Sequence, residues 1–281
     1  MKLSVFLDHV VRAAEQTGRT EEEILRIAHD CGVTGIELNL EDIRSQGAAL
    51  AARLKQAGFE ISCIYMRHDW TKGDYSSGDE QVDAALRLGA SGILVVPGFV
   101  AEDEAKEMNA LSRGADELFD WMDGNETVRH MVRGLNRMVE RADGRIFVSL
   151  EDYDYWAAPY AGLNGLKYFM DRVPGLSFTM DCGNFAYSDE DAMEGFRALR
   201  DRIVHVHTKD RGEDAEVVSR KLSYNQGLLP AAAGDGYLPV GDVVKELLTG
   251  GYRSWFALEF FGSRDHLDYI RRSAAYLKSL E

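Results

Sequence analysis

Short strand-like runs of β-branched and aromatic residues alternate with helical segments along all 281 residues of the chain. Eight such runs lie at residues 3–7, 35–40, 60–66, 91–97, 145–151, 176–181, 203–209 and 255–260. Strands that alternate with helices pair in parallel, because each helix returns the chain to the same edge of the sheet. Eight strands in a chain of this length fit a closed barrel better than an open sheet. The sequence therefore predicts an α/β fold, a (β/α)8 TIM barrel, with residues 1–281 as a single domain.

Capping residues and loop lengths support this alternation. Thr20 before three glutamates predicts the start of a helix, and Gly32 predicts its end. Two long connections, 98–126 and 211–239, follow the fourth and seventh strands. A barrel builds its site at the C-terminal ends of its strands, so each connection is a candidate lid or substrate wall. For the first connection, an expansion without a role is an equal alternative.

The chain is strongly acidic, with 32 Lys and Arg against 47 Asp and Glu and a net charge of −15. Such a charge repels polyphosphate, so we expect no nucleic-acid partner. The apolar runs fall short of the roughly 18 residues that a membrane span needs, and Asp8 comes too early for a secretory signal peptide. Three cysteines without a CxxC pair argue against a disulfide framework. We therefore expect a cytoplasmic protein that meets neither membrane nor nucleic acid.

Four of the strand-like runs carry a metal-binding side chain at their C-terminal end: Glu151, Asp181, His207 and Glu259. In a parallel barrel these ends meet at one face, so the four side chains are expected to converge. Oxygen ligands with one imidazole suit Mn²⁺, Mg²⁺ or Co²⁺, with Zn²⁺ as a further option. Any one of these residues alone would more often be a helix cap, a loop carboxylate or a buried structural histidine. Their repetition at four strand ends favours a site for one divalent metal ion.

The alternation of side chains along each strand gives a test of this prediction. If the four ligands point to the barrel axis, neighbours such as Leu150, Val206 and Leu258 must face the helices. All such neighbours are apolar, as the interface between strands and helices requires. The same alternation turns Glu37 and His205 inward, where they could hold the ligands in place or serve as ordinary core residues.

Further polar and aromatic residues near the strand ends are candidates for substrate binding, each with a structural alternative. Lys209 shares the inward direction of His207 and could bind a substrate oxygen, or lie in an exposed turn. Asn184 could hydrogen-bond a sugar hydroxyl or cap its loop. The remaining candidates lie where a sugar-binding wall and an ordinary loop are equally plausible: Arg67, His68 and Trp156.

Several segments together resemble the xylose isomerase-like TIM barrels, the group with sugar phosphate isomerases/epimerases, ketose 3-epimerases, inosose dehydratases and AP endonucleases of family 2 (endonuclease IV). The matching segments are CGVTGIEL at 31–38, VSLED at 148–152, MDCGN at 180–184, HTKD at 207–210 and the closing stretch 234–259. The resemblance covers essentially the whole chain. No single motif is diagnostic, but the order and spacing of the motifs are fairly specific.

The resemblance implies that Glu151, Asp181, His207 and Glu259 bind one divalent metal ion, and that Glu151 and Glu259 form the catalytic acid/base pair. The chain departs from the family after Asp181, where members usually show Asp-x-x-His and this sequence has Asn184. That difference leaves the four ligands in place but puts the usual sugar contact in doubt. Endonuclease IV would need more histidines at its strand ends than this chain offers.

The function predicted from these residues is a metal-dependent sugar or sugar phosphate isomerase or epimerase. The ion would polarise a carbonyl, one glutamate would remove a proton from the adjacent carbon, and an enediolate would form. An inosose dehydratase-like lyase at the same site is the main alternative; an endonuclease IV-like phosphodiesterase and a non-catalytic sugar-binding barrel are remoter ones. The expected partner is a small sugar or polyol, and a homodimer or homotetramer is possible.

Overall fold

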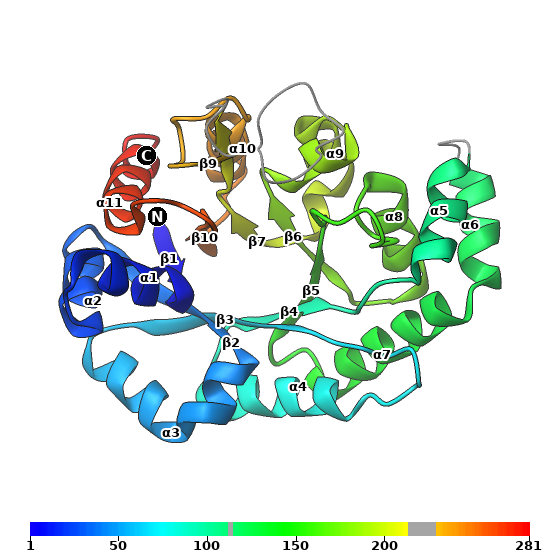
Figure 1. The fold of residues 1–281 in the computed structure, drawn as a ribbon, viewed down its shortest axis with the longest axis horizontal. Helices are drawn as coiled ribbons and strands as arrows, with labels where there is room; N and C mark the ends of the chain where they lie inside the picture. The colour runs from blue at the N-terminus through cyan, green and yellow to red at the C-terminus, as the bar shows by residue number, and fades with distance from the viewer. Residues whose placement is uncertain (112–114, 213–228) are drawn as a thin grey trace. The chain divides into compact units, whose positions relative to one another are not determined.

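A computed structural model of the chain describes residues 1–111, 115–212 and 229–281. Its eight main strands form a closed barrel in the order β1-β10-β7-β6-β5-β4-β3-β2. Figure 1 labels these strands along the chain. The predicted (β/α)8 fold class is thereby confirmed, and each strand overlaps its predicted run. The barrel strands are β1 (Lys2–Phe6), β2 (Val33–Asn39), β3 (Glu60–Arg67), β4 (Gly92–Val96), β5 (Phe147–Glu151), β6 (Ser177–Asp181), β7 (Ile203–His207) and β10 (Trp255–Leu258).

Helices separate these strands, and a short antiparallel pair, β8 and β9, follows β7. The predicted capping is confirmed at Thr20, whose side chain accepts from the Glu23 N–H in a capping box. The α-helices described are α1 (Leu7–Thr17), α2 (Glu21–Asp30), α3 (Leu40–Gln56), α4 (Ser76–Leu88), α5 (Glu102–Ala110), α6 (Ala115–Gly124), α7 (Glu126–Ala142), α8 (Leu163–Arg172), α9 (Ala192–Leu199), α10 (Val240–Thr249) and α11 (His266–Lys278). The short elements are the 3₁₀ helices η1 (Asn184–Ser188) and η2 (Arg200–Arg202), with β8 (Asp210–Gly212) and β9 (Leu229–Ala231).

The two long connections of the sequence differ in the structure. The connection at 98–126 contains α5 and α6, so it is largely helical where it is described. The connection at 211–239 contributes β9, but its stretch 213–228 lies outside the described residues. A role as lid or wall stays a prediction for both.

The chain forms two compact units. Unit 1 comprises Met1–Ser62, Met180–Gly183 and His205–Glu281, and unit 2 comprises Cys63–Thr179 and Asn184–Val204. The boundaries fall inside β3, β6 and β7, so three strands each contribute residues to both units. The assignment of the whole chain to one domain stays a prediction.

In unit 1, the parallel strands β2, β1 and β10 are covered by apolar helix faces. Helix α1 packs against α2 and α11, and each buries side chains such as Val10, Leu25 and Ile270. Burial of a side chain of this size stabilises the fold by about 1.5–3 kcal/mol. The core of unit 1 therefore holds β2, β1 and β10 in place, and with them the polar residues near the ends of β2 and β10.

In unit 2, helix α7 shows how the sequence pattern produces packing. Val128, Met131, Leu135 and Met138 recur at helical spacing and are all buried. On the polar side, two arginines of α7 form paired hydrogen bonds with two aspartates of α4: Arg137 with Asp79, and Arg141 with Asp83. The apolar face supplies most of the stability, because exposed ion pairs contribute only about 0–1 kcal/mol each.

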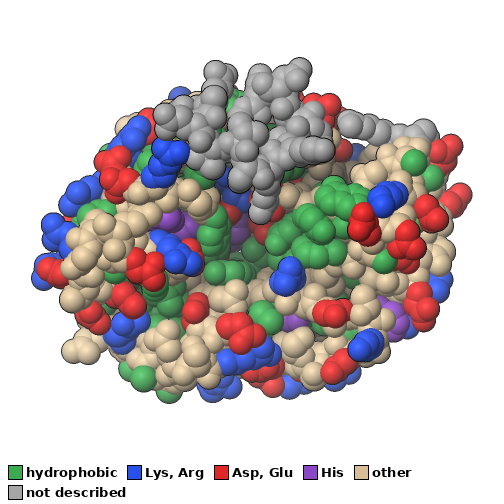
Figure 2. All heavy atoms as spheres, viewed as in Figure 1, with side chains coloured by type: hydrophobic (Ala, Val, Ile, Leu, Met, Phe, Trp, Pro, Cys, Tyr) green, Lys and Arg blue, Asp and Glu red, His purple; other side chains and the backbone are tan. Residues whose placement is uncertain are grey.

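Charged side chains of both signs are mixed on the surface. On the face drawn in Figure 2, basic side chains lie among acidic ones. In the part of the chain that the structure describes, no helix combines the length and apolarity needed to cross a bilayer.

Candidate active site

Three polar side chains of unit 1 meet where three strands end. Asp181 is the last residue of β6, His207 is the last residue of β7, and Glu259 directly follows β10. The Nδ1 atom of His207 lies 2.9 Å from Oε2 of Glu259 and 3.7 Å from Oδ2 of Asp181. All three side chains are buried. These three are the predicted ligands that belong to unit 1, and their side chains contact one another there.

Lys209 joins this group from the residues after β7. Its Nζ lies 3.1 Å from Oδ2 of Asp181 and 2.6 Å from Oε1 of Glu259, and the residue is only 5 % exposed. The aliphatic part of Lys209 passes over Gly183, where an added Cβ would lie 2.8 Å from Cγ of the lysine. Glycine at position 183 therefore leaves room for the lysine. The exposed-turn alternative for Lys209 is wrong, and its predicted contact with substrate stays a prediction.

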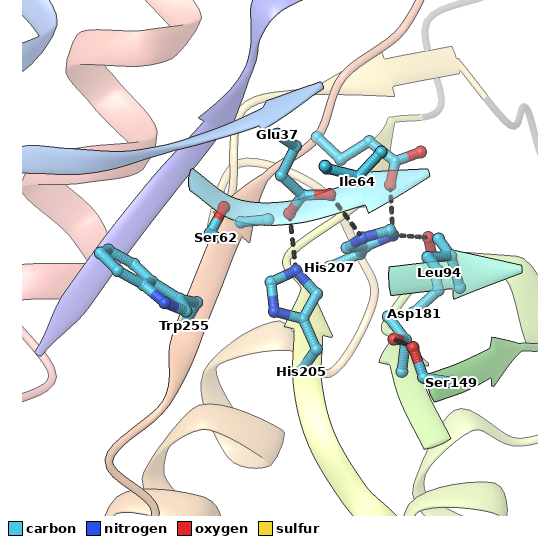
Figure 3. Close-up of polar contacts among 12 residues, drawn as sticks. Glu37, Ser62, Ile64, Leu94, Ser149, Asp181, His205, His207 and Trp255 are labelled. Carbon is cyan, nitrogen blue, oxygen red and sulfur yellow. Dashed lines mark hydrogen bonds and ion pairs between the residues drawn. The ribbon is translucent and has the colours of Figure 1, made fainter. Parts of the chain in front are cut away.

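Glu37, near the end of β2, holds the two histidines of β7. Its Oε1 lies 2.6 Å from Nε2 of His205, and its Oε2 lies 3.4 Å from Nε2 of His207 (Figure 3). A carboxylate at Nε2 favours the tautomer with the proton on that nitrogen. The Nδ1 atom of His207 then faces Glu259 and Asp181. These contacts put Glu37 and His205 on the same side as His207, and their direction toward the barrel axis stays a prediction.

Two carboxyl groups of this cluster have altered acidity. Burial alone would raise the pKa of Glu259, but Lys209 and His207 outweigh burial and lower it to about 2. Burial would likewise raise the pKa of Glu37, and His205 and His207 lower it well below its usual range. Both groups are therefore ionised at neutral pH, although they are buried.

This geometry fits a divalent cation. Ligands about 2.0–2.2 Å from one ion lie roughly 3–3.6 Å from one another, close to the separations of His207 Nδ1 from Glu259 and Asp181. The cluster holds three carboxyl groups, those of Glu37, Asp181 and Glu259, beside the single ammonium group of Lys209. Two protonation states of His207 suit these surroundings. The ring is either an imidazolium between Glu37 and Glu259, or a neutral imidazole whose Nδ1 binds a cation. The oxygen-rich donor set with one imidazole suits Mg²⁺, Mn²⁺ or Co²⁺.

The fourth predicted ligand, Glu151, belongs to unit 2. It is the last residue of β5 and is buried. On the same strand, the Ser149 hydroxyl lies 2.7 Å from the Thr179 hydroxyl of β6, and both side chains are buried. The Nδ2 atom of Asn184 donates to the Asp152 carbonyl at 2.8 Å, and Asn184 is buried. The roles of Glu151 and Asn184 stay predictions.

The other substrate-binding candidates are also in unit 2. His68 is buried, with Nδ1 2.8 Å from the Ser77 hydroxyl and Nε2 2.8 Å from Oε1 of Gln81. Arg67 ends β3, exposed, with its guanidinium carbon 5.7 Å from the centre of the Phe99 ring. Trp156 is 44 % exposed. Their binding roles stay predictions.

Two features of the site were missed by sequence reasoning. One is Gly183, whose only signal is its position in the Asp-x-Gly turn after β6, where its N–H donates to Oδ1 of Asp181 at 2.7 Å. The other is the hydrogen bond of Gln81 to His68, which links α4 to the residue after β3. Neither pairing follows from spacing within one element.

A parallel barrel with buried acids, an imidazole and a lysine at its strand ends is the architecture of a TIM-barrel enzyme. A family-wide sequence profile described as "Xylose isomerase-like TIM barrel" matches residues 25–280. The chain belongs to this family, so the resemblance seen in the sequence is confirmed.

Curated relatives match part of the chain. An inosose dehydratase of Clostridium perfringens is 34% identical over 106 residues, which are 35% of this chain and 36% of the relative. An inosose dehydratase of Lactiplantibacillus plantarum is also 34% identical, over 93 residues, 31% of this chain and 30% of the relative. The matched stretch thus spans about a third of the length of these relatives.

Solved structures share the fold over nearly the whole chain. The probable 3-DHS dehydratase AsbF of Bacillus anthracis superposes with a TM-score of 0.71 at 17% identity, covering 99% of each chain. The 3-keto-D-glucoside 4-epimerase YcjR of E. coli gives 0.64 at 17% identity, covering 89% of this chain and 91% of the other. A xylose isomerase-like TIM barrel protein of Mycobacterium smegmatis, in complex with magnesium, gives 0.63 at 18% identity, covering 91% and 86%. At these identities the likeness shows the fold alone.

Proposed function

We propose that the protein is a metal-dependent enzyme that removes a proton from the carbon next to a carbonyl group of a sugar, cyclitol or related polyol. The observation that carries this proposal is the meeting of Asp181, His207, Lys209 and Glu259 in a buried cluster at three strand ends. Such a cluster combines an ionised carboxylate, a proton donor and candidate metal ligands. The family and the names of the relatives point to a sugar-like substrate.

Asp181, His207 and Glu259, with Glu151 as predicted from the sequence, would hold the divalent ion. When bound, the ion would act as a Lewis acid on the carbonyl oxygen of the substrate. Glu37 would keep the proton of His207 on Nε2, so that Nδ1 stays available as a ligand. Magnesium or manganese is the proposed metal, supported by the oxygen-rich donors and by the magnesium complex of a structural neighbour.

Glu259 and Glu151 are the proposed base and acid. One carboxylate takes the proton from the carbon next to the carbonyl. The electron pair of that C–H bond forms a C=C bond, and the π pair of the carbonyl moves onto its oxygen to give an enediolate. Lys209 is placed beside Glu259, where its ammonium group can donate a hydrogen bond to a substrate oxygen. The low pKa of Glu259 keeps it ionised at neutral pH. A carboxylate of such low pKa is a weak base, so the carbon must be acidified by the neighbouring carbonyl group before Glu259 can take its proton.

Dehydration is the first candidate outcome. The enediolate would then expel the hydroxyl group on the carbon beyond the one that lost its proton. This hydroxyl group would leave as water after it receives a proton from Lys209 or from the glutamate that acts as the acid. The names of the curated relatives and of a structural neighbour, all dehydratases, favour this outcome over the isomerase class that the sequence-based reading placed first.

Epimerisation is the second candidate, favoured by the structural neighbour that is a 3-keto-glucoside epimerase. Here the second glutamate would return a proton to the opposite face of the same carbon. The first step is common to both outcomes, so the same residues serve either reaction.

The test is a panel of an inosose, a 3-keto-glucoside and 3-dehydroshikimate with Mn²⁺ or Mg²⁺ in deuterated water. Loss of water from the product identifies a dehydratase, and solvent deuterium without loss of water identifies an epimerase or isomerase. Glu259→Gln and Glu151→Gln should each slow the active reaction by about 10²–10⁴-fold. Undiminished turnover or exchange in both variants, with the fold intact, would reject the mechanism.

A further inference from the structure

A second cluster of buried histidines lies in unit 1. His9 is in the first turn of α1, and His266 begins α11. Both are buried, and their ring centres lie 5.3 Å apart. Asp8 is beside them: one N or O atom from each of the three residues lies within 4.8 Å of the others. The mechanism above uses none of these residues.

The hydrogen bonds of the two rings fix their tautomers. The N–H of Phe260 donates to Nε2 of His9 at 3.0 Å, so this nitrogen carries no proton and the neutral ring is protonated on Nδ1. Oε1 of Gln16 accepts from the backbone N–H of His266 at 2.9 Å and lies 3.1 Å from Nδ1 of the same residue. His266 is therefore protonated on Nδ1. Burial lowers the pKa of both imidazoles, so both rings are neutral at pH 7.

These tautomers argue against a three-ligand metal site in this cluster. A metal ion on Nδ1 of His9 would have to displace the proton there while Nε2 still accepts from Phe260, and the ring would become an imidazolate. Nδ1 of His9 also lies 3.7 Å from Oδ1 of Asp8, too far for a hydrogen bond. Nε2 is therefore the atom through which His9 contacts the rest of the site.

Nε2 of His9 accepts a hydrogen bond from the peptide that joins Glu259 to Phe260. Strand β10 ends at Leu258, and His9 takes the N–H of Phe260, the first one beyond Glu259. The imidazole also stacks on the Phe260 ring, with centres 4.4 Å apart and planes inclined by 21°. One side chain thus fixes both the backbone and the ring of the residue after Glu259.

The residue before α1, Phe6, packs against both His9 and His207. The ring of Phe6, which precedes α1, lies 5.4 Å from His9 and meets His207 edge-on at 5.2 Å. His9 therefore belongs to a packed layer that contacts His207 through Phe6 and Glu259 through Phe260. This layer packs against the chain directly after β10.

We propose that His9 is a positioning residue for Glu259: by accepting the N–H of Phe260, it orients the carboxylate toward His207 and Lys209. The role rests on the proposed function of Glu259. Without the acceptor at Nε2, the peptide between Glu259 and Phe260 loses its hydrogen bond, and we expect the carboxylate to lose its 2.9 Å and 2.6 Å contacts.

The experiment compares His9→Gln with His9→Asn in the full-length protein. The amide oxygen of glutamine can reach the position of Nε2, whereas that of asparagine reaches only the position of Nδ1. The two variants therefore differ in the position of the acceptor and by one methylene group. His266→Gln is the control, since it changes the neighbouring buried imidazole and leaves the His9–Phe260 hydrogen bond in place. Three quantities are measured: hydrogen exchange of the Phe260 amide, affinity for Mn²⁺, and kcat and KM on the active substrate of the panel.

We expect His9→Asn to expose the Phe260 amide to exchange, and to lower the Mn²⁺ affinity and kcat by about 10–100-fold, as for other residues that orient metal ligands. His9→Gln and His266→Gln should stay near the wild type in all three measurements. Equal losses in His9→Gln and His9→Asn, or none in either, would overturn the role. A wild-type protein that binds no Mn²⁺ and turns over no substrate would instead overturn the proposed function, and this role with it.

Discussion

His68 and His207 are both buried histidines at the C-terminal end of a barrel strand, yet their surroundings differ. His68, after β3, lies against the hydroxyl of Ser77 and the amide oxygen of Gln81, which are neutral groups. His207, at the end of β7, lies between the carboxylates of Glu37 and Glu259. Neutral partners hold a ring in place without adding charge. Carboxylate partners leave a negative charge that a cation can balance, so the comparison separates a structural histidine from a candidate ligand.

The largest effect is expected from Asp181→Asn, which removes a negative charge from the His207 cluster. The Mn²⁺ affinity should fall by more than about 100-fold, beyond the range for residues that only orient ligands. Isothermal titration of the metal-free protein measures this. Asp123→Asn is the matched control, because Asp123 is an exposed carboxylate paired with Arg172. If Asp181→Asn and Asp123→Asn bound Mn²⁺ with equal affinity, the negative charge around His207 would not contribute to metal binding. The contrast drawn between His68 and His207 would then be wrong.

A smaller effect is expected from Glu37→Gln. The amide keeps the shape of the carboxylate but not its charge, so the proton on Nε2 of His207 is held less firmly. The Mn²⁺ affinity should fall by about 10–100-fold while the protein stays folded. Circular dichroism checks the fold, and metal titration checks the affinity. An affinity like that of the wild type would show that Glu37 serves packing alone.

The smallest effect on the site is expected from His68→Leu. This change leaves the Ser77 hydroxyl and the Gln81 amide oxygen without their imidazole partner, which should cost about 1–3 kcal/mol in the free energy of unfolding. Urea unfolding gives that value, and the Mn²⁺ affinity should be unchanged. A fall in metal affinity would contradict the comparison. A higher KM with an intact fold would support the substrate contact predicted from the sequence.

The fold could be predicted because each strand carries a local signal. Runs of β-branched and aromatic residues marked all eight strands, and the alternation of side chains along a strand predicted that Glu37, His205 and His207 share one side. Strand limits were less accurate: the run predicted at 203–209 ends at His207, because Thr208 and Lys209 leave the strand. Apolar alternation marks the buried strand but not the residue at which pairing stops.

The site was only partly predictable, because its contacts join residues far apart in the sequence. Strand-end positions pointed to Asp181, His207 and Glu259. They gave no sign that the Lys209 ammonium would lie between two of these carboxylates. Nor does any periodic pattern relate His9 to Phe260, which are 251 positions apart. Such pairs depend on how a side chain of one helix meets a loop from the other end of the chain.

Gly183 bears on how this protein is studied by mutation. A Cβ at this position would lie within 3.1 Å of the backbone oxygen of Lys209 as well as close to its Cγ, so alanine would push the lysine away from Asp181 and Glu259. An alanine scan that tests only residues with functional groups would pass over position 183. A natural variant with any larger residue there would lose the lysine contacts while keeping every acid, imidazole and amine of the cluster in its sequence. Screening of related sequences for the same activity should therefore require glycine at this turn as well as the chemical groups around it.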